Sequence, residues 1–159
     1  MQDTSVQHNP TYKAVATESA KDQLRDDLFS FLDDKLEPRY RHSVSDEEHY
    51  SNIEELMAFG TKMGAKILQG GTYKVSNAQK LLNLYLKYLW CTGIVEVPPQ
   101  CPIDRIVLEK AGILDVKWTK LKTIKDYRAV VTRLKKAVGN SLAPWELESY
   151  SRRLPHLEK

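Results

Sequence analysis

Hydrophobic residues recur at helical spacing along most of this chain. In the first such stretch, leucine and phenylalanine side chains lie three or four residues apart until Pro38 interrupts the pattern. Because this spacing places apolar side chains on one face of an α-helix, it predicts a helix that begins near Glu18 and ends at Pro38. Residues 1–17 are polar and show no period, which predicts a flexible N-terminal tail.

Later helix starts are marked by pairs of residues with the spacing of a capping box. Three such pairs lie at expected helix starts: Ser45 with Glu48, Ser76 with Gln79, and Thr123 with Asp126. The first pair predicts a second helix that runs to Gly70, after a short basic connector over residues 39–44. Gly60 and Gly64 lie inside this helix and are expected to allow close helix packing.

The third predicted helix, entered at Ser76, has a clear apolar side. Six residues are expected to face inward: Leu81, Leu82, Tyr85, Leu86, Leu89 and Trp90. Lys80, Asn83 and Lys87 are expected on the more polar side. The prolines at positions 98, 99 and 102 then predict an extended connector. A fourth helix is expected to follow, with Pro102 in its first turn and Asp104 near its start, and to end at Gly112.

No long alternation of β-branched residues interrupts these patterns. With helices also expected after Thr123 and Ser141, the sequence predicts an all-α fold: a single compact domain of about six helices with short loops over residues 18–155, followed by a short tail at 156–159. A chain of 159 residues suits one domain. No stretch approaches the roughly 20 apolar residues that cross a bilayer, and the start lacks signal-peptide features, so a cytoplasmic protein without membrane contact is expected.

Charge is distributed unevenly between the two halves of the chain. Residues 1–60 carry 13 acidic and 6 basic side chains, whereas residues 61–159 carry 8 acidic and 18 basic ones. A basic face between residues 110 and 136 predicts DNA or RNA as a partner, or an acidic protein. The expected binding residues are Lys117, Lys120, Lys122, Lys125, Arg128, Arg133, Lys135 and Lys136. The alternative is that the acidic half folds against the basic half and that the remaining lysines are simply solvated.

The sequence lacks the motifs of several common enzyme classes. Glycine-rich phosphate loops, the nucleophile elbow and the H-E-x-x-H motif are absent, so no cofactor is expected. The four histidines, His8, His42, His49 and His156, fall in segments typical of a tail or surface. Cys91 and Cys101 lack zinc-ligand spacing, so no metal site is expected and both are interpreted as plain thiols in a reducing compartment.

Residues 76–113 contain a long apolar helix, a proline-bearing loop, the turn Pro102-Ile103-Asp104 and a short helix ending at a glycine. This order resembles the second half of the helix-hairpin-helix base-excision DNA glycosylases and covers about a quarter of the chain. Lys80 matches the position of that family's catalytic lysine, and Asp104 matches its catalytic aspartate.

The resemblance implies that Lys80 attacks the C1′ atom of a deoxyribose and that Asp104 stabilises the positive charge that develops there. Tyr85, Trp90 and Trp118 are candidates for base stacking. Ordinary roles compete with these: a solvated lysine, a helix N-terminal charge and core aromatics. Because a recognised catalytic set is missing, a small helical nucleic-acid-binding or adaptor protein is the first hypothesis, a glycosylase-like enzyme the alternative, and a helix-turn-helix regulator a third option.

Overall fold

The computed structural model describes residues 11–152, and the regular secondary structure of this range is entirely helical apart from one isolated β-bridge. The α-helices are α2 (Glu18–Phe31), α3 (Asp46–Gly64), α4 (Val75–Cys91), α5 (Arg105–Lys110), α6 (Ile124–Val138) and α7 (Leu142–Arg152). Short turns of other helix types are η1 (Leu32–Leu36), η2 (Glu37–Tyr40), η3 (Gln69–Gly71) and η4 (Trp118–Lys120). The predicted all-α fold class is confirmed.

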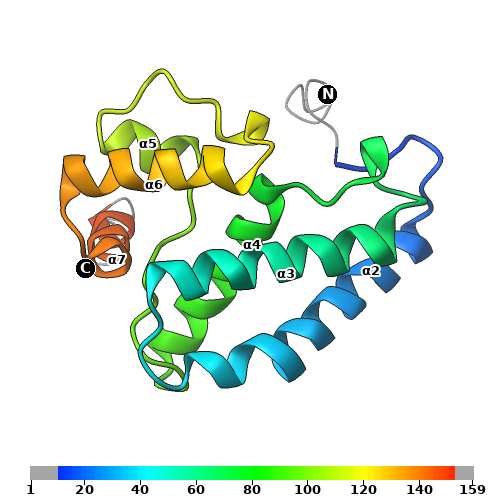
Figure 1. The fold of residues 1–159 in the computed structure, drawn as a ribbon, viewed down its shortest axis with the longest axis horizontal. Helices are drawn as coiled ribbons and strands as arrows, with labels where there is room; N and C mark the ends of the chain where they lie inside the picture. Colours follow the sequence, from blue (N-terminus) through cyan, green and yellow to red (C-terminus); the bar gives the residue numbers. More distant parts are fainter. Residues whose placement is uncertain (1–10, 153–159) are drawn as a thin grey trace.

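The helices form two groups around a shared core (Figure 1). Helices α2 and α3 lie side by side as an antiparallel pair with α4 packed against α3, while α5, α6 and α7 gather at the other side of the molecule. Helix α6 contacts both α3 and α4, and η4 packs against α4. The lysine-rich segment that leads into α6 is therefore held beside α4.

The predicted first helix and its flanks need correction. Helix α2 ends at Phe31, and the chain continues through the π-helical turn η1 and the 3-10 turn η2 as far as Tyr40, which is buried. Part of the predicted connector at 39–44 is thus helical. Tyr12 bridges to Leu68, so the fold begins before Glu18. Residues 1–10 of the predicted tail and the tail at 156–159 lie outside the described residues.

Two of the three predicted caps are confirmed. Ser45 accepts a hydrogen bond from the backbone N–H of Glu48 at 3.2 Å, and Thr123 forms a reciprocal capping box with Asp126. Helix α4 begins one residue earlier than predicted, at Val75, and its N-cap residue Lys74 makes no side-chain cap. The capping-box prediction for Ser76 was wrong because this residue lies inside the first turn.

Two other predicted boundaries were also wrong. Helix α3 ends at Gly64 instead of Gly70, and the chain continues through turns to η3. Helix α5 begins at Arg105, so Pro102 precedes the helix instead of lying in its first turn. Gly112 has a φ of 78°, a left-handed conformation that suits glycine and stops the helix as predicted.

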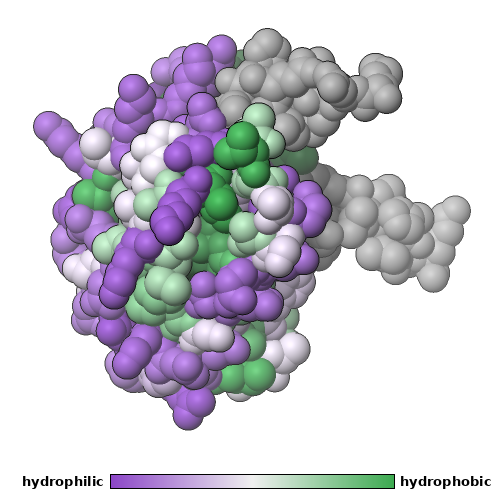
Figure 2. All heavy atoms as spheres, turned by 90° about the vertical axis from the view of Figure 1, so that its right-hand side faces the viewer, coloured by the Kyte–Doolittle hydropathy of each residue, from purple (hydrophilic) through white to green (hydrophobic). Residues whose placement is uncertain are grey.

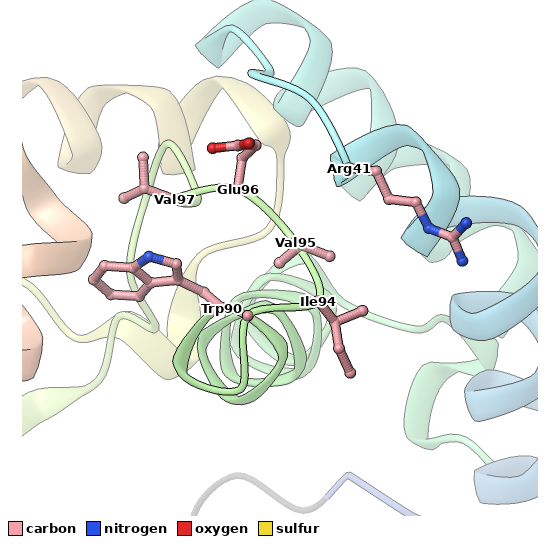
Figure 3. A pocket seen from close by; sticks show the side chains of 7 residues that line it. Arg41, Trp90, Ile94, Val95, Glu96 and Val97 are labelled. Atoms are coloured by element: carbon pink, nitrogen blue, oxygen red, sulfur yellow. The ribbon is translucent and has the colours of Figure 1, made fainter.

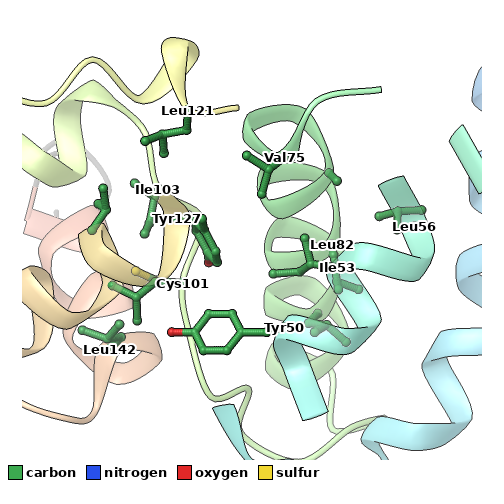
Figure 4. Close-up of a cluster of buried hydrophobic side chains, with 14 of the residues drawn as sticks. Tyr50, Ile53, Leu56, Val75, Leu82, Cys101, Ile103, Leu121, Tyr127 and Leu142 are labelled. Atoms are coloured by element: carbon green, nitrogen blue, oxygen red, sulfur yellow. The ribbon is translucent and has the colours of Figure 1, made fainter. Parts of the chain in front are cut away.

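The core lies where α3, α4 and α6 meet (Figure 4). Tyr50 of α3 and Tyr127 of α6 reach toward each other in this space, with ring centroids 5.9 Å apart in an edge-to-face arrangement. Leu82 and Leu86 of α4 are fully buried, as predicted, whereas Tyr85 and Trp90 are only partly buried. Apolar packing thus joins the two groups of helices.

Glycines allow α3 to approach its neighbours closely, as predicted. A Cβ atom built on Gly60 would lie 2.5 Å from the Cδ2 atom of Tyr73, and one on Gly64 would lie 2.8 Å from the Cδ1 atom of Leu68. At the end where α2 begins and α3 ends, apolar side chains gather within a polar rim (Figure 2). The segments at this end leave Val15 and Met63 exposed.

Gly60→Ala is therefore expected to lower the free energy of unfolding by about 1–3 kcal/mol, although alanine is the better helix former by about 1 kcal/mol. The reason is the clash with the buried Tyr73 ring, which backbone and side-chain shifts must relieve. Urea unfolding measures the change, with Ser51→Ala on the exposed side of α3 as the control. A stabilised Gly60→Ala variant would show that the helix has room there.

Candidate nucleic-acid interface

Four exposed lysines lie within nine residues at η4 and the start of α6: Lys117, Lys120, Lys122 and Lys125. A fifth, Lys80 of α4, places its Nζ atom 4.9 Å from the centroid of the Trp118 ring. This contact brings a lysine from a distant part of the sequence to the lysine-rich segment. We call these five residues the lysine surface.

Acidic side chains neutralise three other residues of the predicted basic face. Arg128 binds Glu47 through two hydrogen bonds of 2.9 and 2.6 Å, Arg133 binds Asp115 in the same way at 2.9 and 2.8 Å, and Lys135 binds Asp46. The guanidinium groups lower the pKa of the Glu47 and Asp115 carboxyls. The predicted pairing of the acidic half with the basic half is confirmed for Asp46 and Glu47.

Within residues 11–152, no ion pair forms at Lys117, Lys120, Lys122, Lys125 or Lys136. Lys136 lies apart from the others, in the last turn of α6. The nearest carboxylate in sequence is Asp126, which is held in the capping box at the start of that helix. Positive charge therefore concentrates on the lysine surface.

The proposed catalytic pair, Lys80 and Asp104, lies in one region of the fold because α4 is tied to the loop before α5. Gln79 donates to the carbonyl of Ile103 at 2.7 Å and accepts from its N–H at 3.0 Å. The Asp104 carboxylate caps α5 by accepting from the N–H of Val107 at 2.9 Å. Asp104 therefore has the structural role that competes with catalysis, whereas Lys80 is partly buried and lies on the Trp118 ring instead of being simply solvated.

The three stacking candidates lie in different places. Tyr85 donates a hydrogen bond to Asp33, and its ring lies 6.4 Å from that of Phe29. Trp90 belongs to the last turn of α4, about 15 Å along the helix from Lys80 at 1.5 Å per residue. Only Trp118 contacts a residue of the lysine surface.

Trp90 instead lines an open pocket of about 510 Å³ at the C-terminal end of α4 (Figure 3). Its other walls are Arg41 and residues 93–97. Ile94 and Val97 are each about half exposed there, at 51% and 48%. Arg41 donates two hydrogen bonds to the carboxylate of Glu37, at 3.0 and 3.1 Å. This pocket is apolar on one side and is separate from the lysine surface.

A chain of buried polar side chains crosses the centre of the molecule, and the sequence reasoning missed it. His49, predicted at the surface, is fully buried, and so is Asn83, predicted on the polar side of its helix. Asn52 and Gln100 are also buried. These residues come from α3, α4 and the loop before α5, and they join hydrogen-bond partners far apart in sequence.

The series of hydrogen bonds that links these buried residues begins at a cationic side chain. Arg39 donates to the Oδ1 atom of Asn52 at 2.6 Å, and Asn52 donates to the hydroxyl of Tyr40 at 2.8 Å. The Oδ1 atom of Asn83 can only accept a hydrogen bond, so the Nε2 atom of His49, 2.7 Å away, carries the ring proton and donates to it. The Nδ1 atom of the neutral ring then accepts a hydrogen bond from the hydroxyl of Tyr40 at 2.7 Å.

The series of hydrogen bonds continues in the same direction and ends at a carboxylate. Asn83 donates to the hydroxyl of Tyr127 at 3.1 Å, and Tyr127 donates to Gln100 at 2.6 Å. Gln100 donates to the Oδ1 atom of Asp46 at 3.0 Å, and Lys135 binds the other carboxylate oxygen. Every donor therefore points away from Arg39 and toward Asp46, an arrangement in which hydrogen bonds polarise one another favourably.

Burial holds these groups in their neutral forms. It lowers the pKa of His49 from 6.5 to about 4, although the hydrogen bond to Asn83 and the charge of Asp46 act in the opposite sense. Burial also raises the pKa of Tyr40, Tyr127 and the Cys101 thiol. None of these groups is therefore charged at neutral pH.

The described part of the chain contains no group of three or more His, Cys, Asp or Glu side chains that could hold a metal ion. Among the same residues, no helix is both long and apolar enough to cross a membrane. Comparison with protein-family models, with curated proteins and with solved structures found no match.

Proposed function

We propose that this protein binds nucleic acid through the lysine surface. The observation that supports this proposal is the division of the basic residues into two sets. Arg128, Arg133 and Lys135 bind carboxylates, whereas Lys117, Lys120, Lys122 and Lys125 are exposed and form no ion pair among the described residues. Clustered, uncompensated lysines attract phosphates and release counterions when they bind them.

The lysine surface is carried by regular elements of the fold. The lysine surface combines a 3-10 turn, the start of a 15-residue helix and one residue of α4, and hydrogen bonds from Gln79 to Ile103 and from Asn83 to Tyr127 tie α4 to its neighbours. Fixed positions reduce the conformational entropy lost on binding. An acidic protein is the competing partner for the same surface.

Removing three charges from the lysine surface is expected to weaken binding about tenfold or more. The variant is Lys117→Ala/Lys120→Ala/Lys122→Ala, and the measurement is fluorescence anisotropy with labelled DNA and RNA oligonucleotides near physiological salt. Since all three side chains are exposed, the fold should be unchanged, which circular dichroism checks.

The matched control removes three exposed lysines elsewhere, with Lys35→Ala/Lys62→Ala/Lys66→Ala. This control should bind within about twofold of wild type, because overall charge falls equally but the lysine surface is intact. Equal losses in both variants would mean that net charge alone drives binding. If wild type binds neither DNA nor RNA, the nucleic-acid proposal fails and an acidic protein becomes the best candidate.

The glycosylase-like alternative is supported by the two hydrogen bonds between Gln79 and Ile103, the residues that precede Lys80 and Asp104 in the sequence. Borohydride trapping on damaged oligonucleotides tests it with the same samples. A trapped adduct that disappears in Lys80→Ala would establish the enzyme. Asp104→Asn is the matched variant, because asparagine also caps a helix and preserves α5.

A further inference from the structure

We infer that the lysine surface recognises single-stranded nucleic acid and that one base stacks on Trp118 in the place now taken by the Lys80 ammonium group. This inference rests on the proposed function and adds the strand type and the contact residue. It depends on three features: the surroundings of Trp118, the relative strength of two contacts with its ring, and the placement of the lysines.

Trp118 is the aromatic side chain that the fold brings to the lysine surface. It lies in η4, a turn with no buried residue, and its indole packs against the edge of the core while staying partly exposed. The charged Nζ atom of Lys80 lies 4.9 Å from the ring centroid. The part of the ring that the Lys80 ammonium group reaches is therefore not covered by the core and can receive other planar or charged groups.

A stacked base binds at this position more strongly than the Lys80 ammonium group. A cation–π contact at an exposed site contributes less to the free energy than stacking of a nucleic-acid base on an aromatic ring. Lys80 is also released to contact a phosphate when the base replaces it, so the exchange leaves its charge satisfied. The contact between Lys80 and Trp118 therefore does not prevent a base from stacking on the ring.

Only an unpaired strand can use this site. In a duplex, each base is stacked between its neighbours, and its face is closed to a protein ring unless the base leaves the helix. In a single strand, the base face is open and the adjoining phosphates lie beside it. Lys117 and Lys120 flank Trp118 in the same short turn, and Lys122 follows, which suits a backbone that passes the ring.

The test compares three polyanions: a single-stranded thymidine oligonucleotide, a duplex of the same length, and inorganic polyphosphate, which has no bases. Trp118→Leu is expected to weaken binding of the single strand about fivefold or more and to leave polyphosphate binding unchanged. Trp118→Phe should retain most of the affinity because its ring still stacks. Trp90→Leu, an aromatic change at the other end of α4, should bind like wild type.

Fluorescence provides a second readout that does not require Trp118 to be removed. In a Trp90→Phe/Trp145→Phe background, Trp118 is the remaining tryptophan, and the single strand should quench its emission while polyphosphate should not. Unchanged affinity in Trp118→Leu together with unquenched emission would overturn the inference and leave the proposed function standing. An equal loss for polyphosphate and single strand would overturn it too. Failure of wild type to bind any of the nucleic acids would instead reject the proposed function itself.

Discussion

Replacing Asn83 with leucine is expected to lower the free energy of unfolding by about 3 kcal/mol. The side chains have similar size, but leucine leaves the Nε2 proton of His49 without an acceptor and removes the donor to Tyr127. A buried polar group without its partner loses the compensation for its desolvation, which accounts for about 1–3 kcal/mol per group. Urea unfolding monitored by circular dichroism measures the loss.

Gln23→Ala is the control for this prediction, because Gln23 makes its hydrogen bond to Asp27 at the exposed surface of α2. It should change the stability by less than about 0.5 kcal/mol. A double-mutant cycle between Asn83→Leu and Tyr127→Phe should show a coupling energy of about 0.5 kcal/mol or more, since both residues belong to one chain of hydrogen bonds. Additive effects, or a loss below about 1 kcal/mol for Asn83→Leu, would mean that the chain contributes little.

Acid is expected to destabilise the protein well before its carboxylates titrate. The pKa of His49 is about 4 in the fold and its ordinary value is 6.5, so between these values the unfolded chain binds the additional proton. The stabilisation is therefore complete above pH 6.5 and is lost as the pH falls toward 4, by about 3 kcal/mol in all. Urea unfolding at several pH values between 7.5 and 4.5 follows this loss.

Glutamine at position 49 should remove most of the pH dependence in this window, because it does not titrate. His42→Gln is the matched control, since His42 is exposed and should leave the pH dependence unchanged. The lowered carboxyl pKa values of Glu47, Asp115 and Asp126 act mainly at lower pH, around and below the ordinary values of 4.5 for Glu and 3.8 for Asp. A wild-type stability that stays constant from pH 7.5 to 5 would contradict the buried neutral histidine.

Local patterns in the sequence predicted most of the helices. Apolar spacing and capping residues act within a few positions, so the starts of α3 at Ser45 and of α6 at Thr123 could be predicted correctly. The Ser76 cap failed because the spacing alone does not show that the helix begins earlier and buries that serine. Boundaries depend on packing that a local pattern does not contain.

The buried polar residues were missed because their partners are remote. His49 and Asn83 are 34 positions apart, and Asn83 and Tyr127 are 44 apart. A local signal existed nonetheless: His49 lies on the same helical stripe as Ile53 and Leu56, and Asn83 lies beside Leu82 and Leu86 on the inward side of α4. Polar residues on an apolar stripe point to a buried network.

The charge asymmetry of the halves predicted pairing in general but could not name the pairs. Arg128 binds Glu47 across 81 positions, and Lys135 binds Asp46 across 89. Only the folded arrangement shows which basic residues bind carboxylates and which form no ion pair among the described residues. The same holds for the Lys80 contact with Trp118, which joins α4 to η4 and extends the lysine surface beyond its segment.

The salt dependence of binding shows whether the lysine surface contacts phosphates. For a single-stranded oligonucleotide, the slope of log K against log salt concentration changes by about 0.7 for each phosphate contact that is lost. The variant Lys117→Ala/Lys120→Ala/Lys122→Ala is therefore expected to bind with a slope shallower than wild type by about 2, while Lys35→Ala/Lys62→Ala/Lys66→Ala keeps the wild-type slope. Identical slopes for wild type and the first variant would contradict the assignment of the lysine surface as the phosphate-binding site.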